Sequence, residues 1–142
     1  MSPIAPLPWS PALAEPRGKV LIVEDDESLR PIVARHLRRQ RFQVSEASSA
    51  EAAISLLSGG LHPDVVLLDV NLPGDTGWDL LRGPALPAAD SPPVLITSAG
   101  SVSPKRLAEF GCAGWLPKPF PMETLVDTLD RLIGKEGANE RT

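Results

Sequence analysis

Short apolar stretches alternate with amphipathic stretches along most of the chain from Lys19 onward. A run that is apolar at nearly every position is typical of a strand buried on both faces, and the first such run covers residues 19–23. Further strands are predicted at residues 42–47, 64–68, 94–97 and 113–116. Five strands separated by helical segments predict an α/β domain with a parallel sheet, right-handed crossovers and helices on both faces.

Helical spacing of apolar residues predicts the first intervening helix. Its apolar face is formed by Leu29, Ile32, Val33 and Leu37. Because proline is tolerated only in the first turn of a helix, Pro31 requires this helix to begin near residues 27–28.

Turn and cap residues delimit the other helices. Ser48 and Glu51 form a candidate capping box for a second helix that ends at Gly59-Gly60. The remaining helices are predicted at residues 77–81 and 104–110, both short, and from Pro121 to Ile133.

Two tails flank the predicted domain, which covers residues 19–133. Residues 1–18 hold 5 of the 16 prolines and are typical of an extended linker, although Leu7, Trp9 and Leu13 offer contacts to a partner. Residues 134–142 are polar and are predicted to fray.

Composition excludes several classes of protein. The 142 residues are 42% hydrophobic and 23% charged, which suffices for a buried core. Because the net charge is −4, the chain lacks the basic surface that direct DNA binding requires. The apolar runs are too short to span a membrane, and no signal peptide is expected. A single cysteine, Cys112, fits a cytoplasmic location.

Charged and hydroxyl side chains follow four of the predicted strands. Glu24 and Asp25 follow the first strand, Asp69 the third, Thr97 ends the fourth, and Lys118 follows the fifth. The carboxyl ends of parallel strands meet at one edge of a sheet, which is where such folds bind ligands. Carboxylates without histidine or cysteine suit a hard cation, Mg²⁺ or Mn²⁺, and the hydroxyl and ammonium suit phosphoryl oxygens.

These residues lie in segments that resemble the receiver domain of bacterial two-component response regulators. The segments are Val20-Leu21-Ile22-Val23-Glu24-Asp25-Asp26, Leu68-Asp69-Val70-Asn71-Leu72-Pro73-Gly74, Ile96-Thr97-Ser98 and Lys118-Pro119-Phe120. The resemblance runs from about Lys19 to Ile133. It implies a flavodoxin-like, doubly wound sheet with strand order 2-1-3-4-5 and five helices.

The resemblance also implies the roles of the site residues. Asp69 is the implied phosphoacceptor, and Mg²⁺ is held by Glu24, Asp25, Asp69 and the backbone carbonyl of Asn71. Thr97 and Lys118 contact the phosphoryl group, and Trp115 takes the place of an aromatic residue that moves when Thr97 moves. The bond between Lys118 and Pro119 is expected to be cis.

Plainer interpretations apply to several of these residues. Asp26 is expected to cap a helix rather than bind metal, and His36 and His62 lack partners at ligand spacing. For Trp115, core packing is the alternative to switching. Residues 83–93 and 101–104 depart from the family pattern, so the usual signalling face of fourth helix, fifth strand and fifth helix is expected to have unusual geometry.

Three functions remain in competition. The first is a stand-alone phosphoacceptor, not an enzyme, that takes phosphate from a sensor histidine kinase or histidine-phosphotransfer protein and signals to a downstream protein. Variants of it are a relay module and a fragment of a longer regulator. The second, an aspartyl-phosphate phosphatase, needs an acid where Asn71 stands. The third is a pseudo-receiver that docks partners constitutively, which the complete set of phosphorylation residues disfavours.

Overall fold

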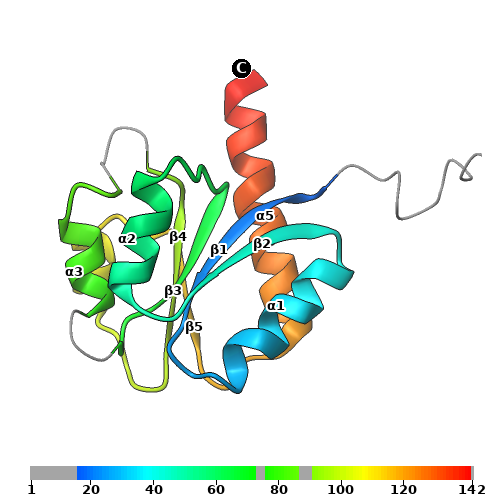
Figure 1. Cartoon of the computed structure of the whole chain (residues 1–142). Coiled ribbons are helices and arrows are strands. Elements are labelled where there is room, and N and C mark those ends of the chain that lie inside the picture. Colours follow the sequence, from blue (N-terminus) through cyan, green and yellow to red (C-terminus); the bar gives the residue numbers. More distant parts are fainter. Residues whose placement is uncertain (1–15, 73–75, 87–90, 142) are drawn as a thin grey trace, which may run out of the picture.

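The computed structural model describes residues 16–72, 76–86 and 91–141 as a parallel sheet with helices on both faces (Figure 1). The sheet has five strands in the order β2-β1-β3-β4-β5, and each neighbouring pair is parallel. This confirms the predicted fold class and strand order. The strands are β1 (Gly18–Val23), β2 (Phe42–Ala47), β3 (Val65–Asp69), β4 (Val94–Ser98) and β5 (Gly114–Pro117).

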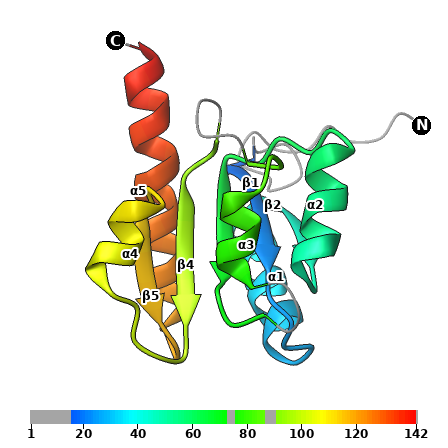
Figure 2. The same cartoon turned by 90° about the vertical axis from the view of Figure 1, so that its left-hand side faces the viewer.

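Helices cover the sheet in two layers (Figure 2). Side chains from α1 and α5 pack with one apolar cluster, and side chains from α2, α3 and α4 pack with the cluster on the opposite face. All five residues of β3 and of β4 are buried, which explains why these strands are almost continuously apolar. The helices are α1 (Leu29–Arg39), α2 (Ala50–Ser58), α3 (Gly77–Arg82), α4 (Pro104–Glu109) and α5 (Met122–Arg141).

The first helix begins where the predicted cap lies. Asp26 Oδ1 accepts hydrogen bonds from the backbone N–H groups of Ser28 at 2.8 Å and Leu29 at 3.0 Å. Asp26 therefore caps the turn that leads into α1, whose N-cap residue is Ser28, and Pro31 falls in the first turn, where its missing N–H costs no hydrogen bond.

The predicted capping box of the second helix is wrong by one residue. Ser49, rather than Ser48, is the N-cap of α2, and its Oγ accepts the N–H of Ala52 at 3.0 Å. Glu51 is consequently the second residue of the helix, so it does not stand at the third position, from which a capping box closes.

A capping box does occur at α3, where none was predicted. Thr76 Oγ1 accepts the N–H of Asp79, and the Asp79 carboxylate accepts the N–H of Thr76 at 2.9 Å. Both α3 and α4 are six residues long, which confirms that they are short. The Trp78 ring of α3 stacks on the ring of Phe110, the C-cap residue of α4, with ring centroids 5.2 Å apart.

The ends of the domain differ from the prediction. Helix α5 continues to Arg141, although residues 134–142 were expected to fray. This segment has no proline, so no residue in it lacks the backbone N–H that a helix requires. At the other end, β1 begins at Gly18, and Arg17 is tied to Asp130 by an ion pair and lies over the Phe42 ring.

Parts of the predicted tail lie outside the described residues, including Leu7, Trp9 and Leu13. Within the described part of the chain, no helix combines the length and apolar character needed to cross a membrane.

Candidate functional site

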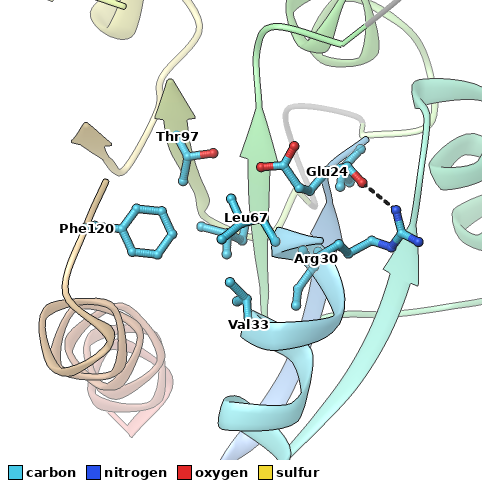
Figure 3. Close-up of a pocket in the computed structure, with 9 residues that line it drawn as sticks. Glu24, Arg30, Val33, Leu67, Thr97 and Phe120 are labelled. Carbon is cyan, nitrogen blue, oxygen red and sulfur yellow. Dashed lines mark hydrogen bonds between the residues drawn. The ribbon is translucent and has the colours of Figure 1, made fainter. Parts of the chain in front are cut away.

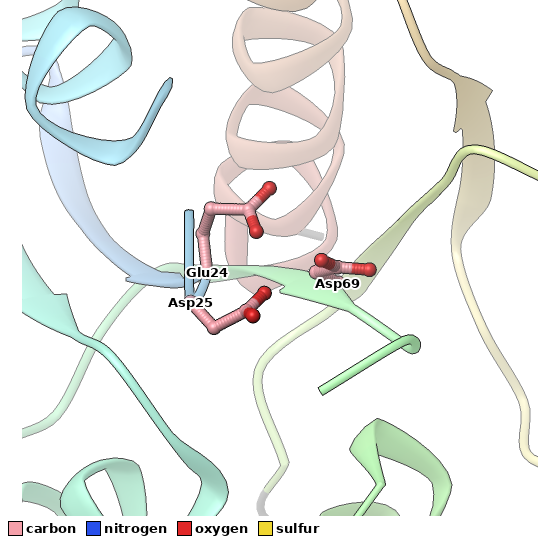
Figure 4. A group of neighbouring side chains, drawn as sticks. All are labelled: Glu24, Asp25 and Asp69. Carbon is pink, nitrogen blue, oxygen red and sulfur yellow. The ribbon is translucent and has the colours of Figure 1, made fainter. Parts of the chain in front are cut away.

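Three carboxylates meet where β1 and β3 end (Figure 4). Glu24 and Asp25 directly follow β1, Asp69 is the last residue of β3, and β1 and β3 are neighbours in the sheet. Each of the three offers one carboxylate oxygen, and these oxygens lie within 4.8 Å of one another. The parallel topology therefore brings together side chains that are 44 and 45 positions apart in the sequence.

The site is largely shielded from water. Asp69 is 3% exposed and Glu24 is 5% exposed, while Asp25 is half-buried. Burial in a protein disfavours the charged form of a carboxyl group unless a cation or a hydrogen-bond donor compensates. The cluster thus requires a positive charge beside it.

Lys118 supplies one positive charge from the far side of the site. Its Nζ lies 3.1 Å from Asp69 Oδ2, and it also forms an ion pair with Glu24. The Lys118 side chain is 18% exposed, and its bond to Pro119 is cis, which confirms that prediction.

The pKa values reflect this crowding. Burial, followed by the hydrogen bond to Asp69, raises the pKa of Glu24 from its ordinary 4.5 to about 7, although Lys118 opposes the change. Burial tends to lower the pKa of Lys118, but its hydrogen bonds to Glu24 and Asp69 outweigh burial and raise it. One ammonium therefore leaves the carboxylates incompletely neutralised.

The donor set fits a divalent cation of the hard type. Carboxylate oxygens are the ligands that Mg²⁺ prefers, and three of them converge here, while a single ammonium of the described residues faces them. Asn71, the fourth predicted ligand, lies two residues beyond Asp69, and its backbone N–H donates to Asp69 Oδ1 at 2.9 Å. This bond fixes Asn71 directly beside the Asp69 carboxylate.

Thr97 lies beside Asp69 at the same edge of the sheet. It pairs with Asp69 in the register of β3 and β4 and is 3% exposed. Thr97 and Glu24 line the same small cavity, and their oxygen atoms point toward the same space (Figure 3). The structure therefore brings together Glu24, Asp25, Asp69, Thr97 and Lys118.

Trp115 lies apart from this group. It pairs with Ile96, not with Thr97, and packs against the apolar cluster under α2, α3 and α4. Since alternate residues of a strand face opposite sides of a sheet, Trp115 and Thr97 are on opposite faces. Trp115 Nε1 is buried and has no hydrogen-bond partner among the described residues.

Two residues that sequence reasoning missed support the site. The buried Ser98 hydroxyl accepts the Asn71 side-chain amide at 3.1 Å and donates to the Gly100 carbonyl at 2.9 Å. Gly77 packs so closely that a Cβ there would lie 2.8 Å from the Asp69 carbonyl oxygen. The only sequence signals are a serine after Thr97 and a glycine at a helix start, and both are too common to stand out.

Comparison with known proteins agrees with this geometry. A family model described as the response regulator receiver domain matches residues 20–130. Response regulator MprA of Mycobacterium sp. (strain KMS) is 31% identical over 124 residues, which cover 86% of this chain and 53% of that protein. The chain thus spans about half the length of this curated relative.

Solved structures show the same relationship. The chemotaxis protein CheY4 of Vibrio cholerae is 31% identical with a TM-score of 0.73, covering 84% of this chain and 99% of that one. The HemR receiver domain of Leptospira biflexa is 31% identical with a TM-score of 0.68, covering 84% and 94%. Because the family match spans most of the sheet and its site-bearing edge, the chain belongs to the receiver domain family of two-component response regulators, as its motifs predicted.

Proposed function

We propose that this domain acts in the cytoplasm as a phosphoacceptor, taking a phosphoryl group onto Asp69 from the phosphohistidine of a sensor histidine kinase or a histidine-phosphotransfer protein. The observation that carries the proposal is the position of the Asp69 carboxylate. It is buried at a sheet edge, 3.1 Å from Lys118 and within reach of two further carboxylates. Nothing in a purely structural role requires so many charges to be gathered there.

Phosphoryl transfer to Asp69 moves negative charge into the site, where Lys118 and a bound cation would neutralise it. An Asp69 carboxylate oxygen attacks phosphorus, the phosphorus–nitrogen bond of the donor breaks, and its electron pair returns to the histidine ring. Lys118 then offers an N–H to the arriving phosphoryl oxygens. Bound Mg²⁺, held by Glu24, Asp25, Asp69 and the Asn71 carbonyl, would neutralise phosphoryl charge. We infer that the domain assists only its own phosphorylation and dephosphorylation.

An apolar surface beside the site supports docking of the phosphodonor. A cavity of about 280 Å³ is lined by Leu29, Ala99, Lys118, Pro119, Phe120 and Met122. On the next turn of α1, Ile32 is 59% exposed. A donor that presents its phosphohistidine on an apolar surface would therefore find a complementary contact next to Lys118.

The phosphorylated state would signal to a downstream protein through α4, β5 and α5. A cavity of about 330 Å³ on this side is lined by residues of β5 and α5, including Trp115, Thr128 and Arg131. Thr97 would start the change by bonding the phosphoryl group. Because Trp115 lies on the other face of the sheet, its response would travel through the backbone of β4 and β5.

Intact-mass measurement tests the proposal. The protein is incubated with acetyl phosphate and Mg²⁺, alongside Asp69→Asn and the control Asp127→Asn, which changes an exposed residue of α5. We expect one added phosphoryl group on the wild type and on Asp127→Asn, and none on Asp69→Asn or after Mg²⁺ is chelated. An unmodified wild type would favour the constitutive docking module, and labelling of Asp69→Asn would place the phosphoacceptor elsewhere.

A further inference from the structure

Arg30 joins the acidic loop, which is formed by residues 24–28 between β1 and α1, to the rest of the domain. From the first turn of α1 its Nη1 donates to the backbone carbonyl of Glu24 at 2.9 Å (Figure 3). The guanidinium also pairs with Glu27 at 2.6 Å and with Glu46 of β2 at 3.4 Å. The side chain is only 12% exposed. No motif in the sequence singles it out, since arginine on a helix is ordinary.

The carbonyl that Arg30 binds belongs to Glu24, where the chain leaves β1 and enters the site. Glu24 is the first residue after β1, and its N–H still donates to the Ala47 carbonyl of β2. With its N–H held by β2 and its carbonyl held by Arg30, the Glu24 peptide is fixed on both sides. These two hydrogen bonds fix the backbone at Glu24 and so determine the direction in which the Glu24 and Asp25 side chains point.

We propose that Arg30 is a positioning residue that fixes the Glu24–Asp25 backbone and thereby sets the divalent-cation affinity of the cluster formed by Glu24, Asp25 and Asp69. The inference rests on the proposed function, because it assumes that the cluster binds a cation. It concerns geometry and not charge. Two carboxylates, Glu27 and Glu46, pair with the guanidinium, so Arg30 contributes little net repulsion toward a cation nearby.

Lysine cannot replace this arrangement. Arg30 uses Nη1, Nη2 and Nε in three directions at once, toward the Glu24 carbonyl, the Glu27 carboxylate just before α1 and the Glu46 carboxylate on β2. A guanidinium has a rigid fork of donors, whereas an ammonium is a single point charge on a flexible stem. Arg30→Lys therefore keeps the charge while it removes the fork.

Arg38 provides a matched control on the same helix. It shares Glu46 as an ion-pair partner at 3.2 Å and donates to the Val44 carbonyl of β2 at 3.1 Å. None of its described contacts reaches the acidic loop. Arg38→Lys thus perturbs the same network at Glu46 without touching Glu24.

Isothermal titration of the full chain with MgCl₂ tests the inference, with urea unfolding in EDTA as a separate measure of stability. We expect Arg30→Lys to weaken Mg²⁺ binding about tenfold. Arg38→Lys should bind Mg²⁺ as the wild type does, while both variants unfold at similar urea concentrations. Equal Mg²⁺ affinity in Arg30→Lys and the wild type would overturn the inference. A wild type that binds no Mg²⁺ would overturn the proposed metal site as well, so the two failures are distinguishable.

NMR of the wild type gives a test that needs no folded variant. The Nε–H resonance of Arg30 should shift on addition of MgCl₂ together with the backbone amide of Asp25, because both belong to one held unit. The Nε–H resonance of Arg38 should stay in place. An Arg30 resonance that does not respond while the Asp25 amide does would contradict the coupling.

Discussion

Lys118 Nζ lies 3.1 Å from Asp69 Oδ2 and is at the same time the ion-pair partner of Glu24. The ammonium thus bridges two of the carboxylates that form the proposed cation site. A divalent cation bound to these carboxylates would neutralise the same negative charges that Lys118 neutralises. In the metal-free protein Lys118 stabilises the cluster, and with metal bound the two positive charges repel one another.

Replacing Lys118 by methionine should therefore act in opposite directions on folding and on metal binding. Without metal, Lys118→Met should lose about 3–5 kcal/mol of unfolding free energy at pH 8, because two buried carboxyl groups are left without their cation. Mg²⁺ affinity should rise several-fold, since the competing charge is gone. Urea unfolding with EDTA or with MgCl₂ measures both effects. Lys105→Met, on exposed α4, is the control that should change neither.

The raised pKa of Glu24 predicts how the stability of the metal-free protein depends on pH. Its pKa is 4.5 ordinarily and about 7 when folded, so the folded state holds a proton that the unfolded state releases. The stabilisation is complete below pH 4.5 and disappears as the pH rises through about 7, amounting to at most about 3 kcal/mol.

Glu24→Gln isolates this contribution, because an amide does not titrate. In EDTA, the unfolding free energy of the wild type relative to Glu24→Gln should fall between pH 5 and pH 8. A difference that stays constant over this range would show that Glu24 is ionised throughout. Because a cation requires the ionised carboxylate, the Mg²⁺-induced gain in stability should grow over the same interval.

Much of the fold could be predicted because strands that are buried on both faces have almost continuously apolar sequences. Residues 65–69 and 94–98 are buried at every position, so their apolar runs identify central strands without any tertiary information. Helix ends were less predictable. Ser48 and Ser49 both offer a capping hydroxyl, and only the backbone conformation decides that Ser49 takes the role. The extent of α5 likewise lacks a sequence signal, since nothing after Ile133 is apolar enough to mark a face.

The site was predictable where strand ends determine it. Asp69 and Thr97 were expected at one edge of the sheet, and the register pairs them directly. Contacts that depend on side-chain direction were not predictable. Arg30 reaches back over six positions to Glu24, and Trp115 faces away from Thr97 because the register offsets it by one residue. The site roles of these residues stay predictions.

The close approach of α3 to the Asp69 backbone leads to a test with an internal control. A Cβ at Gly77 would lie 2.8 Å from both the Asp69 carbonyl oxygen and Val70 Cα, and backbone atoms cannot move aside cheaply. Gly77→Ala should cost about 1–3 kcal/mol of unfolding free energy and slow phosphorylation by acetyl phosphate, because the Asp69 peptide is displaced. Gly100→Ala, where a Cβ would meet no atom within 4 Å, should leave both unchanged. If Gly77→Ala is destabilised but is phosphorylated at the wild-type rate, then Gly77 contributes to packing and not to the reactivity of Asp69.

Thr97 should transmit phosphorylation without being needed for it. Thr97 is buried and is the direct register partner of Asp69. Its hydroxyl can bond a phosphoryl oxygen, a charged hydrogen bond worth about 1.5–3 kcal/mol, which is enough to shift two conformations at least tenfold. Thr97→Ala should therefore accept phosphate, yet show fewer beryllofluoride-induced NMR shifts in α4, β5 and α5, while Thr97→Ser keeps them. If shifts in the wild type are confined to the Asp69 pocket, then Trp115 is core packing. The face formed by α4, β5 and α5 then does not carry the signal.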